Sequence, residues 1–219
     1  IVSDDGAQTE VLERGPSISG EEVLKFYELY RNIIKDSEII CASGSLPQGL
    51  PADTYRDLIL MAKEQGKRFF LDTSGDALKY GIEASPFLVK PNKEELENLM
   101  GCLITSEEDI RKSAKYIMEN GVEIVVVSLG KTGSMVFYDG YYYKVKVPSI
   151  EVVNPVGSGD SMIAGFAVSA LRGYDFEYQL KIAAACGTAN AMEAETGKVD
   201  MANMKKIMNE IEIEKKKMY

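Results

Sequence analysis

A glycine-rich turn that ends in an acidic residue is the strongest candidate for chemistry in this sequence. Residues 154–160 read N-P-V-G-S-G-D, and apolar residues at helical spacing follow over 162–171. Glycines allow successive backbone N–H groups to converge, and the start of a helix adds unpaired donors and a partial positive charge. Gly157, Ser158 and Gly159 are therefore predicted to form an anion hole that binds a phosphate group.

Asp160, at the rim of this turn, has two interpretations. A carboxylate competes with a phosphate for the same N–H donors, so an acidic residue here needs a reason. It is either the N-cap of the following helix or a general base that takes the proton of the hydroxyl group to which the phosphate is transferred. The motif alone leaves both open.

A second candidate site begins at Lys90, directly after a predicted buried strand at 87–89. Open α/β sheets bind ligands at the carboxyl ends of their strands. Asn92 and Glu95 are three positions apart, so both side chains can face one point at the start of a helix. Their oxygens suit a hydrated Mg²⁺, but the same spacing is typical of a helix capping box.

Two further loops follow predicted strands. Residues 128–133 read S-L-G-K-T-G, and their glycines could admit a nucleotide close to the backbone, although a lone loop of this kind is more often a simple turn. Residues 43–49 read S-G-S-L-P-Q-G and follow the apolar run at 39–42.

The composition excludes several kinds of function. With 34 acidic and 25 basic residues the formal charge is −9, which argues against a nucleic-acid partner. There is no histidine, so catalysis must use carboxylates, lysines, hydroxyls or backbone amides. Cys41, Cys102 and Cys186 have no paired spacing, and apolar runs are far shorter than a membrane span. We expect a reduced, cytoplasmic protein without a membrane partner.

The elements that must position these residues alternate between helix and strand. Short, continuously apolar strands are typical of parallel sheets covered on both faces, so a single α/β sandwich with an antiparallel edge is expected over 1–219. The Asp139-Gly140 pair predicts a type I′ hairpin turn, the run 215–217 predicts a solvated tail, and 72–75 predicts a polar loop. The expected helices are at about 20–35, 55–66, 107–118, 160–172, 176–195 and 200–211, with strands at 39–42, 69–71, 87–89, 124–128, 134–138 and 141–147.

Taken together, these motifs resemble the ribokinase-like (pfkB) family of carbohydrate kinases. The resemblance spans nearly the whole chain, and the D-T-S-G-D-A-L segment at 72–78 is similar to the branch that holds tagatose-6-phosphate kinase and 1-phosphofructokinase. It implies a three-layer α/β/α fold with a mainly parallel central sheet. It also implies that ATP and Mg²⁺ are used to phosphorylate a phosphorylated ketohexose, and suggests a homodimer.

The resemblance also implies a role for each candidate residue. Asp160 would be the catalytic base, the amides of Gly157, Ser158 and Gly159 would hold the transferred phosphoryl group, and Ser43 and Gly44 would face the sugar. Asn92 and Glu95 would organise Mg²⁺ through water. The residues implied for ATP are Lys90, Ser128, Leu129, Gly130, Lys131, Thr132, Gly133, Gly159, Asp160, Cys186, Gly187 and Asn190.

One departure from the family is expected to matter. Its members begin with a segment that carries an early strand, much of a small β lid and a sugar-binding motif, and nothing before Thr9 matches that segment. Three functions stay open: a tagatose-6-phosphate kinase, a 1-phosphofructokinase, or a non-catalytic nucleotide-binding module built on the same fold. Asp160 favours an enzyme, because a binding module has no use for a base beside the phosphate.

Overall fold

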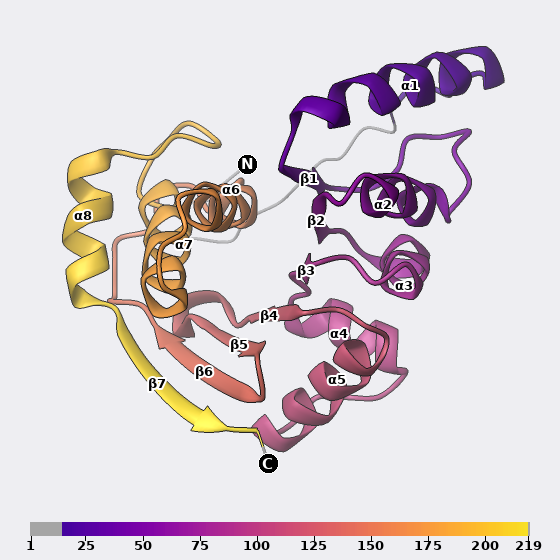
Figure 1. Ribbon diagram of the computed structural model, residues 1–219. Helices are drawn as coiled ribbons and strands as arrows, with labels where there is room; N and C mark the ends of the chain where they lie inside the picture. The colour runs from indigo at the N-terminus through magenta and orange to yellow at the C-terminus, as the bar shows by residue number, and fades with distance from the viewer. Residues whose placement is uncertain (1–14, 219) are drawn as a thin grey trace.

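The computed structural model describes residues 15–218, which form one sheet with helices on both faces (Figure 1). The helices are α1 (Gly20–Ile33), α2 (Thr54–Glu64), α3 (Gly75–Glu83), α4 (Lys93–Met100), α5 (Glu107–Glu119), α6 (Ser158–Leu171), α7 (Phe176–Asn190) and α8 (Met201–Glu210), with 3₁₀ turns η1 (Ile34–Asp36) and η2 (Gly130–Thr132). The strands are β1 (Ile39–Ser43), β2 (Arg68–Asp72), β3 (Leu88–Val89), β4 (Ile124–Ser128), β5 (Ser134–Tyr138), β6 (Tyr141–Lys146) and β7 (Glu212–Lys217).

The seven strands lie in sequence order, β1 to β7. The first four pair in parallel, and the remaining pairs are antiparallel. In Figure 1, α2 to α5 lie on one face of the sheet and α6 to α8 on the other. Each face has its own apolar core, one around Phe69, Leu71 and Val125 and the other around Phe70, Val126 and Phe166. The expected α/β/α sandwich with an antiparallel edge is confirmed.

Local sequence explains why most elements begin and end where they do. The S-G-E-E run at 19–22 predicts a capping box, and Ser19 and Glu22 form it at the start of α1. Gly66 follows α2 in the left-handed conformation. Asp139 and Gly140 both have positive φ, 50° and 74°, as a type I′ turn requires. The hairpin prediction is therefore confirmed.

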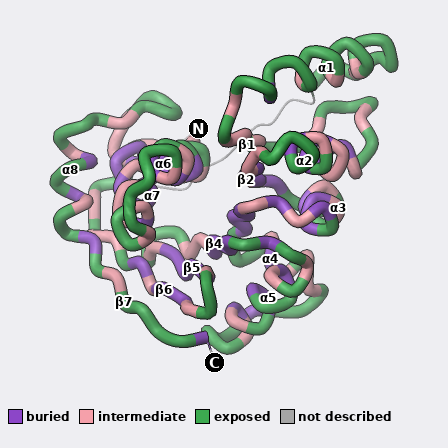
Figure 2. Tube along the Cα trace, viewed as in Figure 1, coloured by how far each residue is buried: buried purple, intermediate pink, exposed green. Residues whose placement is uncertain are grey.

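The expectation of a buried strand at 39–42 was wrong in one respect. A strand forms there, but its residues are half-buried or exposed, in contrast to the buried β2 and β4. β1 is the outermost strand of the described sheet. Figure 2 shows the same contrast, with α1 largely exposed and the burial concentrated between the sheet and its helices.

The lysine run at the C-terminal end is part of a strand rather than a tail. Residues 212–217 pair along the whole of β6, from Tyr141 opposite Lys217 to Lys146 opposite Glu212. The ammonium group of Lys215 lies 4.3 Å from the ring centre of Tyr141 and 5.3 Å from that of Tyr143. Cation–π contact keeps the charge in water while the backbone pairs, and a charged edge strand also resists edge-to-edge association.

Three smaller expectations also differ from the structure. Of the loop expected at 72–75 only residues 73–74 remain, because Asp72 ends β2 and Gly75 begins the helix α3. The T-S-E-E run at 105–108 predicts a capping box of Thr105 and Glu108, but the helix α5 is capped by Ser106 and Asp109. The helix α7 ends at Asn190 rather than near 195. In the described part of the chain, no helix combines the length and apolar character that crossing a bilayer would require.

Candidate active site

The candidate residues follow the strand order along the carboxyl edge of the parallel strands. Ser43 and Asp72 end β1 and β2 and lie opposite each other in the register. Lys90 follows β3, and its backbone N–H donates to the carbonyl of Leu71 at 3.2 Å. Beyond β3, Asn92 and Ser128 form an isolated parallel bridge. Motifs far apart in the sequence thus meet on one edge, as expected for an open α/β sheet.

Asp160 is in the first turn of α6, and the helix N-cap is Gly157, at φ 85°. The interpretation of Asp160 as an N-cap is therefore wrong. Its exposed carboxylate accepts a 2.5 Å hydrogen bond from the hydroxyl of Ser43. This contact places a solvent-accessible carboxylate where the end of β1 meets the start of α6.

A buried ion pair lies beside this contact. The ammonium group of Lys90 is 3.0 Å from Oδ2 of Asp72, and the two side chains are only 8% and 13% exposed. Burial raises the pKa of the Asp72 carboxyl group; the positive charge of Lys90 opposes this rise, and the negative charge of Asp160 adds to it. Lys90 therefore holds a positive charge at a site that is otherwise acidic.

The two glycines of the turn differ in what they provide. Gly157 has positive φ, and an added Cβ there would lie 2.9 Å from the backbone nitrogen of Gly197. Gly159 has no such φ, but an added Cβ would lie 3.1 Å from Nζ of Lys90 and 3.4 Å from Oδ2 of Asp72. The missing side chain of Gly159 thus leaves the amides at the start of α6 open beside the Lys90 ammonium group, an arrangement that suits an anion.

Asn92 and Glu95 form a capping box at the start of α4. Oδ1 of Asn92 accepts from the backbone N–H of Glu95, and Oε2 of Glu95 accepts from that of Asn92, both at 2.8 Å. Burial raises the pKa of the Glu95 carboxyl group, the Asn92 N–H lowers it, and the charge of Asp72 raises it further. The structure therefore contains the capping box, while a role in Mg²⁺ binding stays a prediction.

The loop at 128–133 faces the start of α4. Its turn is closed by hydrogen bonds from Leu129 N–H to the Gly133 carbonyl and from Gly133 N–H to the Gly130 carbonyl. An open hollow of about 410 Å³ separates this loop from the start of α4. It is lined by Asn92, Lys93, Glu94, Ser128, Leu129, Gly130 and Thr132. The loop at 128–133, predicted to bind a nucleotide, and the Asn92 segment thus share one hollow.

The α7 residues lie behind the glycine turn rather than on the open edge. Gly187 is packed so closely against α6 that an added Cβ would lie 2.9 Å from the carbonyl oxygen of Ser158, and the sulfur of Cys186 lies next to Gly165. Asn190 is completely buried. Gly44 lies on the site side, where its N–H donates to the Asp72 carbonyl at 2.9 Å. The expected contact of Cys186, Gly187 and Asn190 with adenine stays a prediction.

Asp72 is the site residue that sequence reasoning missed. Its position as the last residue of a buried strand, in a sheet whose neighbouring strands also end in polar residues, was the available signal.

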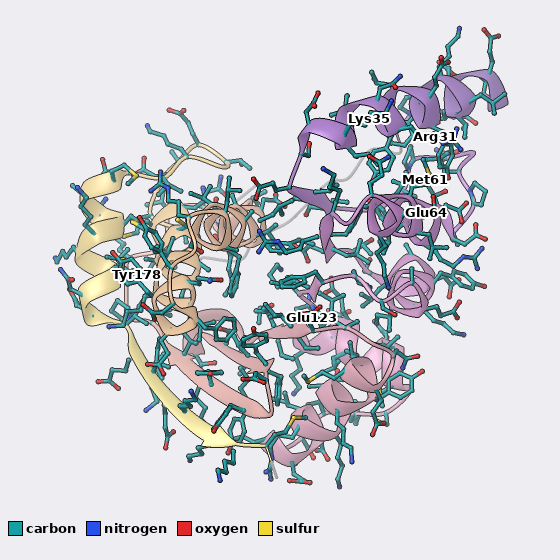
Figure 3. All side chains as sticks on the ribbon, in the orientation of Figure 1. Arg31, Lys35, Met61, Glu64, Glu123 and Tyr178 are labelled. Carbon is teal, nitrogen blue, oxygen red and sulfur yellow. The ribbon has the colours of Figure 1, made fainter. Side chains whose placement is uncertain are left out.

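A second hollow, of about 370 Å³, lies between α1 and α2. Its lining includes Arg31, Lys35, Met61 and Glu64, labelled in Figure 3. Because this groove mixes both charges and contains none of the predicted site residues, we do not assign the chemistry to it.

Comparison with known proteins supports the resemblance drawn from the motifs. The model of the pfkB family of carbohydrate kinases matches residues 1–201. The chain belongs to the pfkB family. Its relatives include a tagatose-6-phosphate kinase of Staphylococcus epidermidis, 38% identical over 212 residues, which make up 95% of this chain and 68% of the relative. This pfkB chain thus spans about two thirds of that relative's length.

Solved structures of other family members share the fold. Phosphofructokinase-2 from Escherichia coli in complex with potassium has a TM-score of 0.86 at 30% identity, over 94% of this chain and 67% of that one. The tetrameric inhibited form of the same enzyme has a TM-score of 0.83 at 28% identity, over 94% of this chain and 66% of that one. These matches support the ribokinase-like fold for this pfkB chain.

Proposed function

We propose that this protein is an ATP-dependent sugar-phosphate kinase, with tagatose 6-phosphate as its acceptor and tagatose 1,6-bisphosphate as its product. The observation that carries the proposal is the contact of Ser43 with Asp160 beside the start of α6. It puts a carboxylate, a set of helix N–H donors and the ammonium group of Lys90 around one point. Phosphoryl transfer needs this combination of positioning and charge stabilisation rather than covalent catalysis.

In the proposed reaction, the carboxylate of Asp160 accepts the proton of the acceptor hydroxyl. The hydroxyl oxygen forms a bond to the γ-phosphorus of ATP, the bond from that phosphorus to the β–γ bridging oxygen breaks, and ADP leaves with the bonding electrons. The amides of Gly157 and Gly159 and the ammonium group of Lys90 stabilise the negative charge, whereas the N–H of Ser158 already bonds to the Pro155 carbonyl at 3.2 Å. A positioned base contributes roughly 10²–10⁴ in rate, and each preorganised donor roughly 10²–10³.

The site fits Mg²⁺ as a partly hydrated ion. Among residues 15–218, no three acidic or thiol side chains gather in a way that could hold a metal by themselves. Mg²⁺ in phosphotransferases typically takes one or two carboxylates, several waters and the substrate phosphates. Asn92 and Glu95 would supply the protein oxygens, since each retains a free lone pair within the capping box. When bound, the ion would neutralise charge on the ATP phosphates.

The acceptor is proposed from the 38% identity with tagatose-6-phosphate kinase. Fructose 6-phosphate is the second candidate, since phosphofructokinase-2 from Escherichia coli, which matches at a TM-score of 0.86, has also been solved in complex with fructose 6-phosphate. Fructose 1-phosphate stays an alternative from the motifs. We expect an oligomer, because one matched structure is tetrameric, and the homodimer stays a prediction.

A coupled assay of ADP release tests the proposal. Tagatose 6-phosphate, fructose 6-phosphate, fructose 1-phosphate and ribose are compared at saturating ATP, and kcat/KM decides among them. The highest kcat/KM for tagatose 6-phosphate would support the proposed acceptor. ATP binding without ADP release on any acceptor would instead indicate the non-catalytic module.

A further inference from the structure

Asn190, the last residue of α7, is completely buried, at 0% exposed. Buried polar side chains are normally hydrogen-bonded, and this one uses both ends of its amide. Nδ2 donates to the backbone carbonyl of Lys198 at 2.9 Å, and Oδ1 accepts from the hydroxyl of Ser158 at 3.4 Å. One side chain therefore joins the end of α7, the first residue of α6 and the segment that follows α7.

That segment, residues 191–199, supports the glycine turn from behind. The backbone N–H groups of Val153 and Asn154 donate to the carbonyl of Ala191 at 2.8 and 3.2 Å, and Nδ2 of Asn154 donates to the carbonyl of Ala194 at 3.1 Å. At Gly157, an added Cβ would lie 2.8 Å from Thr196 and 3.4 Å from Oδ1 of Asn190. The turn therefore packs against this segment, and Asn190 bonds both to Ser158 in the turn and to Lys198 in the segment.

We propose that Asn190 is a positioning residue for the anion hole. By bonding Ser158 on one side and Lys198 on the other, it fixes the first turn of α6 relative to the 191–199 segment, so that the N–H groups of the turn point to one place. This role requires no contact between Asn190 and the nucleotide. Its catalytic consequence rests on the proposed function, while its structural part does not.

The physical reason is the sensitivity of catalysis to position. A displacement of about 1 Å in a catalytic group can lower the rate about a hundredfold. Removing the buried amide would leave the Lys198 carbonyl and the Ser158 hydroxyl without this partner, and both groups then favour a rearrangement that restores hydrogen bonding. The first turn of α6 is the part that would move.

The first test compares Asn190→Ala with Asn120→Ala. Asn120 is the control for the loss of an asparagine amide at a helix end: it is the half-buried C-cap of α5, and its Nδ2 donates to the backbone carbonyl of Tyr116 at 2.9 Å. We expect Asn190→Ala to lower kcat at least about tenfold while the KM for ATP stays within about twofold. Asn120→Ala should change neither. An equal loss of kcat in both variants would overturn the proposal.

Hydrogen exchange provides a readout that does not depend on activity. The N–H groups of Ser158 and Ser161 bond to the carbonyls of Pro155 and Gly157. In Asn190→Ala they should exchange faster, while the amides of β4 keep their rates. Unchanged exchange at α6, or a uniform increase over the whole protein, would overturn the proposal. If the unaltered protein phosphorylates no sugar phosphate, the exchange result still decides the role of Asn190, and only the proposed function falls.

Should Asn190→Ala fail to fold, Ser158→Ala takes its place in the exchange experiment. This substitution removes only the hydroxyl that bonds to Oδ1 of Asn190. Faster exchange confined to the start of α6 would support the positioning role, and unchanged exchange would overturn it.

Discussion

The hydroxyl of Ser43 donates a 2.5 Å hydrogen bond to Oδ1 of Asp160, across 117 positions of the sequence. It joins the carboxyl end of β1 to the first turn of α6. Oδ2 of Asp72 is 3.5 Å from the same hydroxyl. The ammonium group of Lys90 pairs with that Asp72 oxygen. Ser43, which is proposed to face the sugar, therefore also holds the carboxylate of the proposed base, Asp160, at the edge of the sheet.

We expect Asp160→Asn to lower kcat at least about a hundredfold while leaving ATP affinity nearly unchanged, because only the transition state uses the base. Steady-state kinetics and equilibrium nucleotide binding measure the two effects. Asp200→Asn is the control, since Asp200 caps α8 by accepting from the N–H groups of Ala202 and Asn203 and asparagine caps equally well. A parallel fall in ATP affinity and kcat would remove Asp160 from the role of base.

Glu95→Gln should shift the Mg²⁺ dependence of activity to higher concentration, because a neutral amide is a weaker partner for the metal and its waters. Glutamine can preserve the capping box with Asn92, so the helix should remain intact. Asp109→Asn is the matched control, because Asp109 has the same capping position in α5. Identical Mg²⁺ titrations for Glu95→Gln and the unaltered protein would leave Glu95 as a cap alone.

Alanine at the two turn glycines should change different properties: stability at Gly157 and turnover at Gly159. Gly157→Ala forces a side chain into positive φ and against the backbone of Gly197, and should cost about 1–3 kcal/mol of unfolding free energy. In Gly159→Ala the atoms nearest to the added Cβ are the ends of the Lys90 and Asp72 side chains rather than backbone, so the melting temperature should be kept while kcat falls. Both quantities are measured on the same preparations. A lower melting temperature with unchanged kcat for Gly159→Ala would contradict the anion hole.

Lys90→Met should destabilise the protein in a pH-dependent way. Loss of one partner of a buried pair costs about 3–5 kcal/mol, and without Lys90 the pKa of Asp72 rises further above its ordinary value of 3.8. A raised folded-state pKa means that stability is retained at low pH and is lost as the pH rises through that pKa.

The difference in melting temperature between Lys90→Met and the unaltered protein should therefore be small near about pH 4 and larger near about pH 7. Lys25→Met, which breaks the exposed pair with Glu21, should show little change at either pH. If the difference in melting temperature between Lys90→Met and the unaltered protein does not depend on pH, the titration of Asp72 does not cause the loss of stability.

Much of the site could be predicted from the sequence because its chemistry is local. The turn at 154–160 and the Asn92 segment are short motifs in which residue type and spacing determine backbone conformation and donor positions. Short apolar strands alternating with helices predicted the α/β sandwich, since only a sheet covered on both faces buries such strands.

Relations between distant segments were decided by the tertiary structure. Asp72 looks like a loop residue in the sequence, and becomes a site residue because parallel pairing places it beside Ser43 and Lys90. The run Lys215–Lys217 has no apolar signal of its own, yet it forms a strand because β6 offers an open edge with aromatic side chains. The family resemblance implies that Asn190 flanks adenine, and this stays a prediction; that its buried amide bonds to Ser158 and Lys198 became visible only in the tertiary structure. Hydrogen-bond partners brought in from elsewhere in the chain, and burial against them, are not encoded in local spacing.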